Sequence, residues 1–139
     1  MKQALALIVA AMGAGCSASA AIPDEPLTDR YWRALAIDGK AVSAADNHSE
    51  PHIVLTGSGK THGSDGCNRF NGAYELDRGL RFGGMASTRK ACVPPIDTQA
   101  GRFSGALHAT TAYVIRGRML ELIDADGRVR MRLESVALR

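Results

Sequence analysis

The residues that could do chemistry gather in the middle of the chain. Cys67 lies near His62 and Asp65, and a thiol, an imidazole and a carboxylate could act as nucleophile, base and orienting group. Cys67 could instead pair with Cys92, because the third cysteine, Cys16, belongs to an N-terminal leader. Export to an oxidising compartment favours pairing. We therefore expect a disulfide, which would close a loop of about 25 residues and add roughly 3 kcal/mol of stability.

A second stretch is similar to a phosphate-binding loop. Gly59-Lys60-Thr61 has the ending of that motif, but Val54 occupies the position where the motif needs its first glycine. The motif also needs a helix to follow, whereas an extended segment follows here. We interpret the stretch as a hairpin turn.

The histidines do not follow a metal-ligand pattern. None is paired with another at a spacing of three or four residues within an expected helix, and no second thiol lies near either cysteine in sequence. We expect surface histidines, no metal site and no cofactor; the residues concerned are His48, His52, His62 and His108.

Length and charge restrict the class of protein. A chain of 139 residues with 45% apolar residues can form one compact domain. The formal net charge is +3, and one positive charge, Lys2, belongs to the leader. A nucleic-acid-binding domain needs a concentrated basic face, and Trp32 is the only tryptophan available for stacking. We expect no nucleic-acid partner.

The N-terminus has the pattern of an export signal. A short basic start precedes an apolar run over residues 4–12, which is too short to span a bilayer and fits a signal peptide over residues 1–15. Gly13-Ala14-Gly15-Cys16 resembles a lipobox, in which the cysteine is acylated. Cleavage after Ala20 is the alternative, since small residues also precede that position. Both alternatives export the protein.

Residues 16–30 predict a flexible tether, because the segment is rich in Ser, Ala and Pro and has no apolar periodicity. The folded domain is predicted over residues 31–139. Resemblance to bacterial lipoproteins in general makes Ser17, after the anchoring cysteine, compatible with sorting to the outer membrane.

The rest of the chain predicts a mainly β protein with one helix (α+β). Strands are expected at residues 31–37, 52–56, 60–62, 70–76, 80–82, 112–116, 119–124 and 128–134. A helix follows Pro94-Pro95, capped by Asp97 or Thr98, and its apolar face comprises Phe103, Ala106, Leu107 and Thr110. Seven or eight short strands suggest a small antiparallel barrel-like sheet with the helix packed on it, and closure would remove exposed edges.

Two motifs carry a family resemblance. The first is Gly66-Cys67-Asn68-Arg69-Phe70 with Gly72 and Tyr74, and the second is Met85-Ala86-Ser87-Thr88 with Cys92. Together they resemble the signature of the META-domain family, which includes the HslJ-like heat-shock lipoproteins of bacteria. The resemblance covers Trp32 to Leu133 and implies a small meander-type barrel with one helix.

We expect the first motif to be architectural. Gly66 and Gly72 would let the loop bend at both ends, while Phe70 and Tyr74 lie four residues apart on one face and would enter the core. Two asparagines, Asn68 and Asn71, would satisfy backbone groups of the loop. Arg69, on the opposite face from Phe70, would be free to meet a partner.

The resemblance implies a stress-related or envelope-maintenance role. We therefore expect a non-catalytic lipoprotein that is exported to the periplasm and anchored by lipid to the outer membrane. We expect it to be a monomer and to bind another envelope protein, which the sequence does not identify. The alternative is a binding or inhibitory protein directed at an envelope-attacking hydrolase. We expect no enzyme, because no pair of carboxylates and no activated nucleophile emerges from the sequence.

Overall fold

The computed structural model describes residues 15–43 and 49–137. Most of the predicted signal peptide and the predicted surface histidine His48 lie outside the described residues. The strands are β1 (Tyr31–Ile37), β2 (Lys40–Ala41), β3 (His52–Leu55), β4 (Lys60–Ser64), β5 (Arg69–Glu75), β6 (Arg81–Ser87), β7 (Thr110–Arg116), β8 (Met119–Asp124) and β9 (Val129–Val136), and the helix is α1 (Ile96–Ala109). In this part of the chain no helix is long and apolar enough to cross a membrane.

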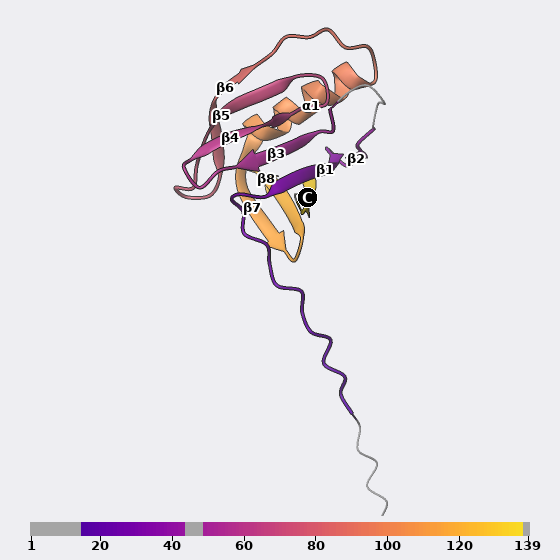
Figure 1. The fold of residues 1–139 in the computed structure, drawn as a ribbon, viewed down its shortest axis with the longest axis vertical. Helices are drawn as coiled ribbons and strands as arrows, with labels where there is room; N and C mark the ends of the chain where they lie inside the picture. The colour runs from indigo at the N-terminus through magenta and orange to yellow at the C-terminus, as the bar shows by residue number, and fades with distance from the viewer. Residues whose placement is uncertain (1–14, 44–48, 138–139) are drawn as a thin grey trace, which may run out of the picture.

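The strands form a single antiparallel sheet in the order β6-β5-β4-β3-β1-β9-β8-β7, with β2 paired to β1. The sheet curves around α1, which contacts β6 at one end of the order and β8 near the other (Figure 1). The prediction of a mainly β fold with one packed helix is confirmed.

The expected closure of the barrel is wrong. The end strands β6 and β7 are not paired in a ladder. A backbone hydrogen bond from the Leu80 N–H to the Thr111 carbonyl, at 3.1 Å, links their starting ends. Closure would need a full ladder between these strands, and a single bond leaves the sheet curled but open.

The core lies between the curved sheet and α1. Trp32 and Phe103 are fully buried in it, and the Trp32 indole N–H donates to the Leu27 carbonyl at 2.9 Å. The pattern of β9 is confirmed, since Met131 and Leu133 point into the core. Alternate positions of a strand face opposite sides of a sheet, so the arginines between them lie on the outer face.

The helix begins one residue before the expected cap. Pro95 is the N-cap residue of α1, and it makes no side-chain capping hydrogen bond, so the predicted cap at Asp97 or Thr98 is wrong. The Asp97 carboxylate instead accepts hydrogen bonds from Thr98, at 2.6 Å from its backbone N–H. The predicted apolar face is confirmed, because its four residues are buried: Phe103, Ala106, Leu107 and Thr110.

The folded domain begins earlier than Tyr31. The Glu25 N–H donates to the Gly117 carbonyl at 2.8 Å, and the Asp29 N–H donates to the Leu55 carbonyl at 2.7 Å. Leu27 is part of the core. Residues 24–30 therefore belong to the domain, and the predicted tether over residues 16–30 is too long at its C-terminal end.

Candidate functional site

The loop between β4 and β5 is held by a buried carboxylate. Asp65 Oδ1 accepts hydrogen bonds from the backbone N–H groups of Cys67, at 2.8 Å, and Asn68, at 2.6 Å. The Gly66 N–H donates to Ser64 Oγ at 3.1 Å, and Gly66 has a φ of 95°, which glycine adopts without steric cost. Asp65 therefore acts as the cap of this loop, a role that sequence reasoning missed.

The expected disulfide is confirmed. Cys67 and Cys92 are joined, with Cα atoms 6.1 Å apart. Cys67 therefore has no thiol with which to act as a nucleophile, and His62 lies on the exposed side of β4. Of the three residues that the sequence allowed as a catalytic constellation, Cys67 and Asp65 instead fix the loop.

A side-chain amide fastens the two motifs to each other. Asn68 Oδ1 accepts hydrogen bonds from the Lys90 N–H at 2.6 Å and from Thr88 Oγ1 at 3.0 Å. Thr88 also makes two hydrogen bonds to the Arg69 backbone. Its Oγ1 accepts from the Arg69 N–H at 3.2 Å, and its N–H donates to the Arg69 carbonyl at 3.0 Å. The Asn68 side chain thus satisfies a backbone group of the segment between Thr88 and Cys92, and not one of its own loop as expected.

The aromatic residues of the first motif enter the core as expected. Phe70 packs against Phe103 with ring centroids 5.7 Å apart, and Tyr74 is equally buried. The Tyr74 hydroxyl donates to the Thr56 carbonyl at 2.5 Å. Asn71, in contrast, lies exposed within β5, where its backbone pairs with His62 on one side.

Two glycines allow the close packing of these strands. A Cβ on Gly72 would collide with Met85 Sδ and would lie 2.9 Å from the Gly83 carbonyl oxygen. A Cβ on Gly63 would lie 2.9 Å from Phe70 Cζ. Met85 therefore packs over Gly72, and this contact joins the two motifs a second time. Ala86 of the second motif is exposed.

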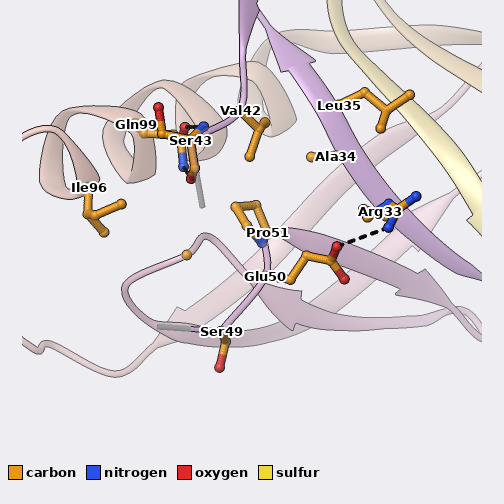
Figure 2. Close-up of a pocket in the computed structure, with 11 residues that line it drawn as sticks. Arg33, Ala34, Leu35, Val42, Ser43, Ser49, Glu50, Pro51, Ile96 and Gln99 are labelled. Atoms are coloured by element: carbon orange, nitrogen blue, oxygen red, sulfur yellow. Dashed lines mark hydrogen bonds and ion pairs between the residues drawn. The ribbon is translucent and has the colours of Figure 1, made fainter. Parts of the chain in front are cut away.

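A pocket of about 280 Å³ lies beside the loop, where β1 separates from β3 (Figure 2). Apolar side chains form much of its lining: Ala34, Leu35, Val42, Pro51 and Ile96. At one end Arg33 pairs with Glu50 at 3.5 Å and with Glu134 at 2.8 Å. At the other end the buried Gln99 side chain accepts from the Ser43 N–H at 2.7 Å and donates to its carbonyl at 3.1 Å.

Several polar groups at the pocket's charged end bond one another, whereas Arg33 Nε is buried without a hydrogen-bond partner among the described residues. The Tyr31 hydroxyl donates to Glu50 at 3.0 Å, and burial together with this bond raises the pKa of Tyr31 above its usual range. Tyr31 also stacks on His52, with ring centroids 4.3 Å apart, and burial lowers the pKa of His52. No residue type or spacing in the sequence indicated this pocket, because its walls come from separate segments.

The described residues contain no group of three or more His, Cys, Asp or Glu side chains that could hold a metal ion. The arrangement has two features that could contact a ligand: a disulfide-fixed loop with the exposed cation Arg69, and an apolar pocket with an ion pair at one end. The predicted partner-facing role of Arg69 stays a prediction.

Comparison with known proteins agrees with the fold. A solved NMR structure of a protein from Burkholderia xenovorans superposes with a TM-score of 0.64 at 24% identity, covering 93% of this chain and all of that one, and this likeness shows the fold alone. A second NMR structure has a TM-score of 0.59 at 26% identity, with 78% of this chain and 89% of the other covered. A search of curated proteins found no match. The META domain model matches residues 25–137, which include both motifs and residues 25–30, and the chain belongs to the META-domain family.

Proposed function

We propose that this protein is an exported, non-catalytic META-domain protein of the HslJ-like kind, which serves envelope maintenance under stress. It is monomeric, and acylated Cys16 tethers it in the periplasm to the outer membrane. Its partner is another envelope protein.

The observation that carries this proposal is the disulfide between the two motifs of the family. Cys67 and Cys92 join the signature loop to the segment after β6. Disulfides form and persist in oxidising compartments such as the periplasm, so the bond supports export. It also removes the thiol that a cysteine-based enzyme would need, which supports a non-catalytic role.

The tether is supported by the way the chain enters the domain. Residues 15–23 are exposed and extend away from the sheet, so an acylated Cys16 could reach a membrane without disturbing the fold (Figure 1). Several acyl chains on one cysteine would anchor the domain firmly, whereas one chain would bind only marginally.

Fractionation of cells that carry Cys16→Ser tests the anchoring. We expect the variant in the soluble periplasmic fraction and the parent protein in the outer membrane. Cells that lack the protein should grow more poorly than the parent strain under heat or detergent stress, and the wild-type chain should restore growth. Membrane partitioning that is unchanged in Cys16→Ser would contradict the lipid anchor, and equal growth of both strains would contradict the maintenance role.

A second candidate function is inhibition of an envelope-attacking hydrolase. The observation that favours it is the rigidity of the signature loop, which a disulfide and Asn68 fix in place, because a preorganised loop loses less entropy on binding. Lysozyme activity measured with increasing amounts of the purified protein tests this function. Full activity at a large excess of the protein would argue against it for that enzyme.

A further inference from the structure

The positive charges of this protein are unevenly compensated. Every arginine on β1, β7, β8, β9 and the turns between β7 and β9 makes an ion pair with a carboxylate: Arg33, Arg116, Arg118, Arg128, Arg130 and Arg132. The other half of the sheet differs. Arg69, Arg89 and Lys90, which we call the basic tip, are exposed and make no ion pair within the residues that the structure describes.

The backbone of the basic tip is fixed in place. Thr88 hydrogen-bonds the Arg69 backbone, and Asn68 accepts from the Lys90 N–H at 2.6 Å. The disulfide at Cys92 holds the chain two residues beyond Lys90. Three cationic residues thus come from neighbouring backbone segments that are fastened to each other, and an anionic partner would be attracted to them.

Apolar surface adjoins these cations. Val93 is 74% exposed, more than any other large apolar side chain of the folded domain, and exposed prolines follow it. A shallow hollow of about 350 Å³ lies between Lys90 and α1, and the disulfide, Ala91 and Ala100 form part of its wall. Two carboxylates also line this hollow: Asp65 is buried and caps the loop, whereas Asp97 is exposed at the start of α1. Both keep their negative charge, so the carboxylates of a ligand must lie on the Lys90 side of the hollow and only its apolar part can enter.

The basic tip lies at the end of the sheet opposite the tether. Residues 24–29 bond to the β7–β8 turn and to the end of β3, whereas Arg69 pairs with Ser64 at the other end of β4 and β5. Figure 1 shows the same separation, with residues 15–23 leaving the domain far from the segment that joins β6 to α1. This surface therefore lies at the end of the domain away from the point where the tether attaches.

We propose that the basic tip, with Val93 and the adjacent hollow, is the docking surface for an acidic segment of another envelope protein that also carries an apolar side chain. Its carboxylates contact Arg69, Arg89 and Lys90, and its apolar side chain enters the hollow. An anionic glycan would use the cations but not the apolar surface. A lipid surface would use the cations, but one exposed valine is too little apolar surface for membrane insertion.

This inference rests on the proposed envelope-tethered function, and photo-crosslinking in the full chain tests it. A photoreactive amino acid replaces Val93, and in a control strain it replaces Leu76, which is 49% exposed in the turn after β5. Each strain is combined with Arg69→Gln/Arg89→Gln/Lys90→Gln, or with the matched triple Lys60→Gln/Arg78→Gln/Arg81→Gln. Both triples remove three charges, and the second removes them at the tether end.

We expect a protein adduct at position 93 whose crosslinked peptide from the partner contains Asp or Glu next to an apolar residue. The yield should fall about tenfold or more in the basic-tip triple and stay within about twofold in the matched triple, because complementary charges guide and hold such encounters. The single variant Arg89→Gln should lower the yield in the same direction.

Four results would overturn the proposal. They are an adduct to lipid or peptidoglycan, an adduct to a segment without acidic residues, an equal loss in both triples, and no excess of adduct at position 93 over position 76. Membrane fractionation of the same strains reports the anchor separately. A tethered protein without the acidic adduct would refute this inference alone, and a released protein would refute the anchoring.

Discussion

Truncation of Phe70 to alanine tests whether the signature loop is built into the core. Phe70 is only 8% exposed, packs against Phe103 at a centroid distance of 5.7 Å, and lies so close to Gly63 that a Cβ there would come within 2.9 Å of Phe70 Cζ. Because β4 and β5 are paired on both sides of this contact, they cannot collapse into the vacated space. The loss should therefore be the full cost of a buried Phe→Ala change, about 3–5 kcal/mol.

That loss is large against the stability of a small domain. The free energy of unfolding of such domains is about 5–15 kcal/mol, and a loss of 1 kcal/mol in it lowers Tm by about 4 °C at this size. Phe70→Ala should lower Tm by roughly 12–20 °C, measured by circular dichroism with the disulfide intact. Arg69→Ala, one residue away and exposed, should change it by less than about 2 °C. Equal losses in the two variants would show that Arg69 is structural and would refute the division of roles in this loop.

Three further changes should have measurable effects. Cys67→Ala/Cys92→Ala should lower the free energy of unfolding by about 3.5 kcal/mol, because the disulfide closes a loop with a sequence separation of 25; denaturant unfolding with no loss would contradict this. Backbone hydrogen bonds, from Arg128 first, lower the pKa of Asp124, so this group stabilises the fold above its unfolded pKa of about 3.9, and that stability is lost as pH falls through the folded pKa. Tm measured from pH 6 down to about pH 2 should therefore fall less steeply in Asp124→Asn, and parallel curves would refute the assignment. Gly105→Ala should raise stability by about 0.5–1 kcal/mol, since a Cβ there meets nothing within 4 Å on the helix; a lower Tm would reveal an unrecognised contact.

The sequence predicted the elements whose patterns are local. The alternation of Met131 and Leu133 with arginines placed β9 correctly, because strand periodicity depends only on which side chains face the core. The apolar spacing around Phe103 likewise placed the buried face of α1. Such patterns fix a face and a type of element, and they fix the ends of elements less well.

The parts that the sequence did not predict depend on contacts between distant segments. β6 continues through Gly83 and Gly84, beyond the strand expected over residues 80–82, because pairing with β5 and the packing of Met85 over Gly72 override the low strand preference of glycine. The Leu27 side chain is buried, and the Leu27 carbonyl accepts a hydrogen bond from the Trp32 indole N–H. No periodicity in the sequence could reveal this contact. The pocket beside Gln99 was missed for the same reason, since its walls belong to β1, the segment before β3 and α1.

The bonds of the signature loop limit which residues could contact a partner in the proposed function. The side chains of the loop bond the loop itself or the segment after β6. Asp65 accepts from the loop backbone, Cys67 forms the disulfide, and Asn68 accepts from the Lys90 N–H, so all three already have structural partners. Phe70 is likewise committed to the core. The motif that marks the family therefore acts as a fastening, which sets the positions of neighbouring exposed residues. A partner of this surface would therefore have to contact those neighbouring residues. Among them, the basic tip together with Val93 combines positive charge with exposed apolar surface.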